Sequence, residues 1–178
     1  LKLMYLSATL EGLAIPEGHP KLSSEGRMFD VEISYLPQRP SPKWMFEFID
    51  FVNQTLRTHE GDALVFLPGS GEVNFCIEKL KDAMGSALSE SIEFCPLYGS
   101  LSFDVQKRAL VSSEKRKVIV ATNIAESSLT IEGVQLVIDS GWMKSIEYKP
   151  DYKRDVLVET KISKASATQR AGRAGRTQ

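Results

Sequence analysis

The chain has 178 residues, 42% of them hydrophobic and 25% charged, and its formal net charge at pH 7 is -1. These values predict one globular domain with a sizeable core, and they exclude a polycation that binds nucleic acid through its overall charge. The charges are nevertheless uneven, because residues 1–97 carry 8 basic and 14 acidic side chains whereas residues 98–178 carry 14 and 9. This asymmetry indicates either an anionic partner for the second half or two ordinary solvated faces.

The two cysteines, Cys76 and Cys95, each lie in an apolar run. Their number and spacing match neither a zinc site nor a disulfide framework, which predicts buried thiols in a reducing compartment. No apolar run is long enough to cross a bilayer. The opening LKLMYLSATL is too short and too polar for a signal peptide and lacks an initiator Met. We therefore expect a cytoplasmic protein with no membrane partner, whose sequence begins inside a larger protein.

The first elements in chain order are a short strand-like run at Leu3–Leu6 and a Pro/Gly-rich connector over residues 15–26. Within MFDVEISYLP, Val31, Ile33 and Tyr35 alternate with polar residues, which predicts a half-exposed strand.

The break RPSPK then places Ser41 as the cap of a helix whose first residue is Pro42. The helix is predicted by an apolar stripe with helical spacing, formed by Met45, Phe48, Ile49, Val52 and Leu56.

From residue 63 onward, short apolar runs alternate with helical stripes. The apolar runs lie at residues 63–67, 92–97, 118–121 and 135–139, and the helices at residues 73–88 and 102–111. Buried strands that alternate with helices predict an α/β fold with a parallel sheet covered on both faces. The stretch between residues 121 and 135 has about a dozen residues, the minimum for a parallel crossover. Residues 144–162 instead predict an exposed β-hairpin of two polar strands around a Pro/Asp turn.

Small polar residues follow three of the predicted strands. These exits contain PGSG after residue 67, YGS after residue 97 and TN after residue 121. Parallel strands bring their carboxyl ends to one edge of the sheet, where backbone N–H groups and hydroxyls suit phosphate groups. Each exit taken alone is more typical of an ordinary turn than of a binding site. Together they indicate a nucleic-acid or nucleotide site at this edge.

The closing segment, SKASATQRAGRAGR, concentrates positive charge at residues 163–176. If it is helical, Gln169, Arg173 and Arg176 lie on one face. Gly172 and Gly175 between them either pack closely on the sheet or leave the arginines unobstructed. An Arg guanidinium matches phosphate oxygens bidentately, which suggests arginine fingers at a γ-phosphate. The chain has no Gly-x-x-x-x-Gly-Lys-Ser/Thr phosphate loop and no obvious Mg²⁺ ligand beside one, so the rest of such a site must come from elsewhere.

An ordered set of segments resembles motifs III, IV, IVa, V and VI of DEAH-box RNA helicases, closest to the bacterial HrpB-type members. The segments are SAT (7–9), LVFLPGSGEV (64–73), CPLYGSLSFDVQKR (95–108), KVIVATNIAESSLTIEGVQLVIDSG (117–141) and the closing segment. The resemblance implies that residues 28–178 form the second of two RecA-like lobes, a parallel sheet flanked by helices with a protruding β-hairpin, truncated after motif VI. Residues 1–27 would be the last strand and Ser-Ala-Thr motif of the preceding ATP-binding lobe plus a linker.

The resemblance also implies roles for individual residues. The catalytic and phosphate-contacting residues would be Gln169, Arg173 and Arg176. Thr130 and Glu132 would lie beside the ribose of ATP, and Ser7 and Thr9 would couple hydrolysis to lobe movement. The RNA backbone would contact Gly69, Ser70, Ser100, Thr122 and Asn123. The implied cofactors are ATP and Mg²⁺, the implied partners are single-stranded RNA and the first lobe, and the hairpin would separate or guide strands.

Two positions depart from the family. Glu132 stands where many eukaryotic relatives have Asp, and Leu110 stands where the family often has an aromatic residue that stacks on the base, so we expect weak discrimination among nucleotides. We also expect no ATP hydrolysis by this chain alone. The alternatives are a lobe of a DNA translocase from the same superfamily, since backbone contacts distinguish sugars poorly, and a nucleic-acid-binding module that needs no nucleotide.

Overall fold

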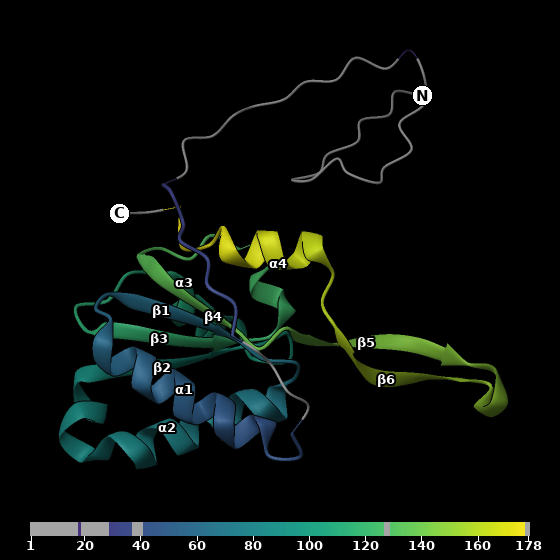
Figure 1. Cartoon of the computed structure of the whole chain (residues 1–178), viewed down its shortest axis with the longest axis horizontal. Helices are drawn as coiled ribbons and strands as arrows, with labels where there is room; N and C mark the ends of the chain where they lie inside the picture. Colours follow the sequence, from purple (N-terminus) through teal and green to yellow (C-terminus); the bar gives the residue numbers. More distant parts are fainter. Residues whose placement is uncertain (1–17, 19–28, 37–40, 127–128, 177–178) are drawn as a thin grey trace.

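A four-stranded parallel sheet forms the centre of the computed structural model, which describes residues 18, 29–36, 41–126 and 129–176 (Figure 1). Its strands are β1 (Asp62–Phe66), β2 (Ile92–Leu97), β3 (Arg116–Ala121) and β4 (Val134–Asp139), in the order β2-β3-β1-β4. Neighbouring strands are parallel throughout. The predicted α/β fold is therefore confirmed, and each strand lies within two residues of its expected position.

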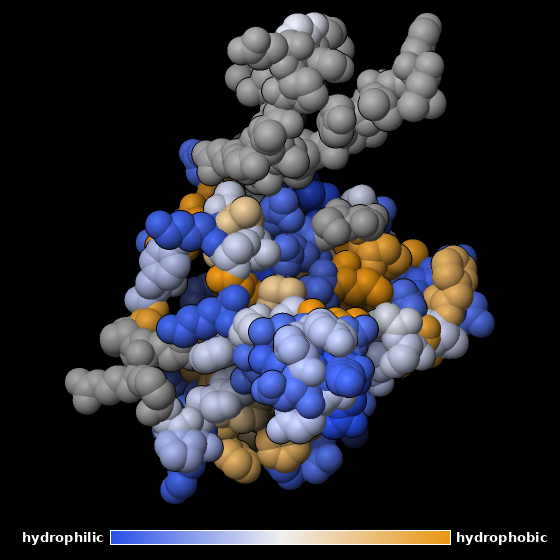
Figure 2. Space-filling model, turned by 90° about the vertical axis from the view of Figure 1, so that its right-hand side faces the viewer, coloured by the Kyte–Doolittle hydropathy of each residue, from blue (hydrophilic) through white to orange (hydrophobic). Residues whose placement is uncertain are grey.

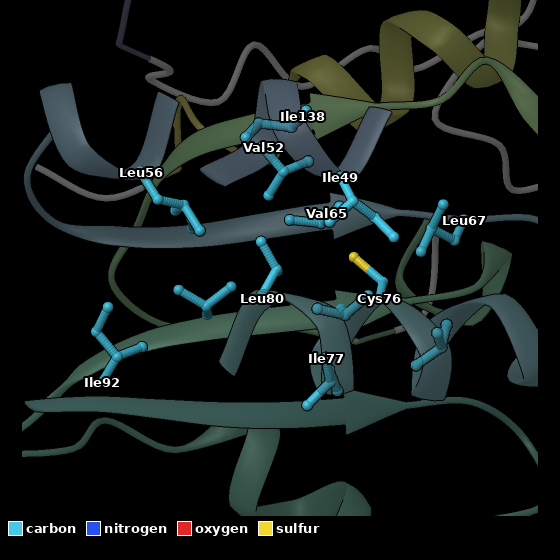
Figure 3. Packing of buried hydrophobic residues seen from close by; sticks show 14 of the residues in the cluster. Ile49, Val52, Leu56, Val65, Leu67, Cys76, Ile77, Leu80, Ile92 and Ile138 are labelled. Carbon is cyan, nitrogen blue, oxygen red and sulfur yellow. The ribbon is translucent and has the colours of Figure 1, made fainter. Parts of the chain in front are cut away.

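Helices cover both faces of this sheet. Helices α1 (Trp44–Thr58) and α2 (Ser70–Ser91) pack on one face, and α3 (Phe103–Leu110) packs on the other. Residues of β1 alternate between the two hydrophobic clusters, so that Val65 faces α1 and α2 whereas Leu64 faces α3. Figure 3 shows the side chains of α1 meeting β1 and α2 in the first cluster. Burial on both faces explains why the strands read as continuous apolar runs.

The starts and ends of the helices differ from the predictions at two places. Helix α1 begins at Trp44 with Lys43 at the N-cap, so the predicted cap at Ser41 is wrong. The Ser41 hydroxyl instead stabilises the preceding turn, where it accepts a hydrogen bond from the Lys43 N–H at 3.1 Å. In α2, Gly85 adopts a positive φ of 74° and interrupts the helix. Leu88 beyond this break is 37% exposed and does not continue the buried stripe.

The predicted hairpin is present and extends away from the sheet (Figure 1). Strands β5 (Trp142–Lys149) and β6 (Arg154–Lys161) pair antiparallel around a 3-10 turn, η2 (Pro150–Tyr152). Its surface is less polar than expected, because the cross-strand partners Ile146 and Leu157 are 72% and 61% exposed.

Residues 29–36 form no strand, so that prediction is wrong. Ile33 and Tyr35 are exposed, so the alternation of apolar and polar residues buries no face and gains nothing from sheet pairing. The Phe29 N–H donates to the Gly175 carbonyl at 2.9 Å, which places this segment against the end of the closing segment. Ser7, Thr9, the run Leu3–Leu6 and the predicted domain boundary at residue 27 lie outside the described residues.

The last helix, α4 (Lys164–Ala171), follows the hairpin and packs near β4. Ser163 caps it through its hydroxyl, which accepts a hydrogen bond from the Ser166 N–H at 3.0 Å.

Candidate nucleic-acid and nucleotide sites

The carboxyl ends of the parallel strands form an open pocket of about 250 Å³. All five residues expected at an RNA backbone line this pocket: Gly69, Ser70, Ser100, Thr122 and Asn123. They come from the exits of β1, β2 and β3, which lie side by side in the sheet. The prediction that these exits share one edge is confirmed, whereas the contact with RNA stays a prediction.

Backbone hydrogen bonds hold the three exits in place. The Thr122 N–H donates to the Leu97 carbonyl at 3.0 Å, and the Leu67 N–H donates to the Ala121 carbonyl at 2.9 Å. These bonds continue the sheet ladder one residue past each strand. Thr122 is therefore only 9% exposed, while Asn123 after it faces solvent. Backbone hydrogen bonds thus hold the strand exits in the sheet, and the accessible polar side chains of the pocket are those of Ser70, Ser100 and Asn123.

Two further lining residues did not emerge from the sequence: Lys144 and Leu157. The Tyr98 hydroxyl accepts a hydrogen bond from the Asn74 side-chain amide at 3.2 Å, which ties the second exit to α2. Lys144 and Leu157 belong to the hairpin, so the pocket is shared between the sheet edge and the hairpin base. Figure 2 views the molecule from the hairpin end and shows a mainly hydrophilic face with patches of hydrophobic residues.

The closing segment differs from its expected geometry. Helix α4 ends at Ala171, and the chain continues in tight turns in which the Arg173 N–H donates to the Arg170 carbonyl at 3.1 Å. The helical spacing that would align Gln169, Arg173 and Arg176 on one face therefore stops before Arg173. The expectation of a single helical face with two unobstructed arginines is wrong.

Arg173 points inward and is 2% exposed. Its guanidinium donates to the Glu126 carbonyl at 2.7 Å and also to the Leu129 carbonyl. Both carbonyls lie outside the helices and strands, so the guanidinium supplies hydrogen bonds that no ladder provides there. Burial lowers the pKa of the Arg173 guanidinium, and the nearby charge of Arg176 lowers it further. Arg176 itself is exposed and Gln169 is half-buried.

Arg170, to which the sequence assigned no role, is the best-buried charge of the segment, with 0% exposure. Its guanidinium forms ion pairs with Glu126 at 3.1 Å and with Asp139 at 2.9 Å. It also lies 4.7 Å from the centroid of the Phe66 ring. Arg170 therefore fixes α4 against Asp139 at the end of β4 and against Glu126.

The two residues expected at the ribose lie away from the pocket, just before the amino end of β4. Thr130 and Glu132 are both exposed, and Ile131 between them is buried. The Glu132 N–H donates to the Leu110 carbonyl at 3.4 Å, so the two positions that depart from the family are in contact. Thr130 follows Leu129, whose carbonyl binds Arg173. Arg173 thus binds the residue next to Thr130, and neither of these two residues lines the pocket at the sheet edge.

Within the described ranges there is no group of three or more His, Cys, Asp or Glu side chains that could hold a metal ion. In the same part of the chain, no helix combines the length and the apolar character needed to span a membrane.

Residues 47–178 match the model of the helicase conserved C-terminal domain. The chain is 40% identical over 182 residues to the ATP-dependent RNA helicase HrpB of Escherichia coli (strain K12), covering 99% of this chain and 22% of that protein. It is also 40% identical over 161 residues to a putative pre-mRNA-splicing factor ATP-dependent RNA helicase of Schizosaccharomyces pombe, covering 88% of this chain and 25% of the relative.

The fold matches a crystal structure of the Escherichia coli DExH-box NTPase HrpB with a TM-score of 0.75 and 42% sequence identity, over 86% of this chain and 19% of that one. A second crystal structure, of the DEAH/RHA helicase HrpB of the same organism, gives the same TM-score over 85% of this chain and 19% of that one. The chain thus spans about a quarter or less of the length of these relatives.

Proposed function

Because the chain belongs to the helicase conserved C-terminal domain family, we propose that it is the second RecA-like lobe of an ATP-dependent RNA helicase. In this role it grips the backbone of single-stranded RNA and moves against an ATP-binding lobe as ATP is hydrolysed. The observation that carries the proposal is the single pocket that collects Gly69, Ser70, Ser100, Thr122 and Asn123.

The chemistry of the pocket suits a phosphodiester backbone. Ser70 is the first residue of α2, where unpaired N–H groups and the helix dipole favour an anion. Hydroxyls of Ser100 and Thr122 and the Asn123 amide supply neutral donors, and Lys144 supplies a positive charge. Contacts of this kind position a strand without reading its bases. They support translocation along RNA of any sequence.

The nucleotide half of the proposal rests on the closing segment and the loop before β4. Arg176 is the exposed guanidinium, and we assign it as the finger that reaches a γ-phosphate bound to the first lobe. Gln169 lies two residues before the end of α4 and would orient the attacking water. Arg173 would act as a second finger only after leaving the carbonyls of Glu126 and Leu129, so in the chain as it stands it positions the loop that carries Thr130 and Glu132.

ATP would be the nucleotide and the first lobe would supply the phosphate loop and the Mg²⁺ ligands. When bound, the metal would neutralise charge on the phosphates, while this chain supplies guanidinium groups and the ribose contacts of Thr130 and Glu132. The half-buried Leu110 gives no aromatic platform for the base, so affinities for ATP and GTP should lie within about tenfold of each other. The chain alone should hydrolyse neither. Cys76 and Cys95 are buried and unpaired, which supports a cytoplasmic location.

Binding of a short labelled oligouridylate, followed by fluorescence anisotropy, tests the pocket. Asn123→Ala should weaken binding about tenfold, the lower end of the effect of one lost hydrogen bond to a charged group. Ser91→Ala, at the far end of α2, serves as the matched control and should change nothing. Equal affinities for wild type and Asn123→Ala would refute the assignment of the pocket. Stimulation of ATP turnover by RNA and by DNA of the same sequence, compared in a protein where this chain follows an ATP-binding lobe, distinguishes an RNA helicase from a DNA translocase, since the backbone contacts of the pocket itself distinguish sugars poorly.

A further inference from the structure

One ion pair lies at the base of the candidate RNA pocket. The Lys144 Nζ is 2.7 Å and 2.8 Å from the two carboxylate oxygens of Glu72. Both side chains are partly buried, with exposures of 29% and 25%. Lys144 is on hairpin strand β5 and Glu72 is in the first turn of α2, so the pair links the hairpin to the helix that opens at the pocket.

The backbone of Gly69 brings this ion pair against the pocket floor. A Cβ atom at Gly69 would lie 2.6 Å from both the Lys144 Nζ and a Glu72 carboxylate oxygen, so the pair packs directly against this glycine and would have to shift to admit a side chain. Lys144 and Gly69 line the pocket, whereas Glu72 is not among its lining residues. Lys144 therefore borders the pocket, while its ammonium group is paired with a carboxylate whose residue does not line it.

We propose that Glu72 competes with RNA for Lys144. In the free chain the Glu72 carboxylate pairs with the Lys144 ammonium group. When RNA binds, a phosphate replaces the carboxylate as the partner of that ammonium group. Carboxylate and phosphate oxygens are equivalent partners for a lysine, whose three donors sit on a flexible stem and have no fixed orientation. This inference rests on the proposed function, because it describes the regulation of the same pocket. Glu72 thereby limits the RNA affinity of the resting chain.

The alternative is that the ion pair only braces the hairpin. A brace predicts that loss of Glu72 leaves the hairpin less firmly held and the pocket less well formed, so that RNA binding weakens. Competition predicts the opposite sign, because Lys144 no longer has to leave a carboxylate. A partly exposed ion pair contributes at most about 1 kcal/mol, so its removal should tighten binding about two- to fivefold.

The test measures binding of a short labelled oligouridylate to four variants of the chain, at salt concentrations between about 50 and 200 mM. Glu72→Gln keeps the shape of the side chain and removes its charge. Glu78→Gln is the matched control, because it removes the same charge from the same helix at an exposed position paired with Lys79. Lys144→Met and the double variant Glu72→Gln/Lys144→Met complete the set.

We expect Glu72→Gln to bind about two- to fivefold more tightly than wild type and more tightly than Glu78→Gln. Lys144→Met should bind more weakly. Its plot of log K against log salt should be less steep than that of wild type by about 0.7, the value for one phosphate contact on a single strand. In the Lys144→Met background, Glu72→Gln should tighten binding by removing an unpaired carboxylate but should not restore the salt slope, because only Lys144 makes the phosphate contact.

Glu72→Gln that binds no more tightly than Glu78→Gln overturns the competition, and so does a Lys144→Met variant whose salt slope equals that of wild type. Both results leave RNA binding by the pocket intact. A wild-type chain that does not bind the oligouridylate at low salt overturns the proposed function itself, so the two failures are distinct.

Discussion

Arg170→Ala should destabilise the chain more than any other single change in the closing segment. The substitution removes a fully buried guanidinium and leaves Glu126 and Asp139 without their shared partner. Loss of one member of a buried ion pair costs about 3–5 kcal/mol, because the remaining charge is left uncompensated. The contact with the Phe66 ring adds about 1 kcal/mol in a partly desolvated site.

The two carboxylates are not fully buried, which moderates this cost. Glu126 and Asp139 keep 15% and 22% of their side-chain surface exposed, so water reaches them after the guanidinium is lost. We therefore expect the lower end of the range, about 3 kcal/mol of unfolding free energy. With a urea m-value of about 2 kcal/mol/M, the midpoint of unfolding should fall by about 1.5 M.

Urea unfolding followed by circular dichroism measures this shift. Arg176→Ala is the matched control, since it removes the same side chain from an exposed position six residues later and should change stability by no more than about 0.5 kcal/mol. Arg170→Lys should lie between the two, because an ammonium group lacks the planar fork that serves both carboxylates. A loss below about 1 kcal/mol for Arg170→Ala would refute the structural role of this residue.

Three further predictions concern stability and reactivity. Gly175→Ala places a methyl group 2.7 Å from the Phe29 carbonyl oxygen, so it should lower the free energy of unfolding by about 1 kcal/mol and speed proteolysis near residue 29. The control Gly71→Ala meets nothing within 4 Å and should raise the free energy of unfolding by about 0.4–1 kcal/mol. Similar thermal midpoints for the two variants would contradict this. Lys117→Met removes an ammonium group that binds three carbonyls at the end of α3, and urea titration should show a loss of about 2 kcal/mol, whereas an unchanged midpoint would show that water replaces it. Burial raises the pKa of Cys76 to about 12 and raises that of Cys95, so a thiol reagent at pH 8 should label neither residue before the chain unfolds; labelling at the rate of a free thiol would disprove the burial.

The sheet and its pocket were predictable because their signals are local. Four buried strands appear as apolar runs, and each exit carries its own small polar residues. Parallel pairing then requires the exits to share one edge, which is why residues as distant in sequence as Ser70 and Asn123 line one pocket. Lys144 was missed because its place depends on how the hairpin leaves the sheet, which no local pattern specifies.

The closing segment was harder to predict because contacts with residues distant in the sequence determine where its side chains lie. Regular spacing suggested one face for Gln169, Arg173 and Arg176, but the helix ends at Ala171 and the turns after it rotate Arg173 inward. The carbonyls of Glu126 and Leu129 accept hydrogen bonds from that guanidinium, and the carboxylates of Glu126 and Asp139 form ion pairs with Arg170. Charge alone does not reveal which arginine is buried, since that depends on tertiary contacts.

The most direct test of the proposed motor is RNA-stimulated ATP turnover by a protein in which this chain follows an ATP-binding lobe. Arg176→Ala should reduce the stimulated turnover by a factor on the order of 10³ or more, the contribution of an arginine finger. The isolated chain should show no turnover with or without RNA. Undiminished turnover in the Arg176→Ala protein, or ATP hydrolysis by the isolated chain, would contradict the assignment of this lobe as the partner that completes the nucleotide site.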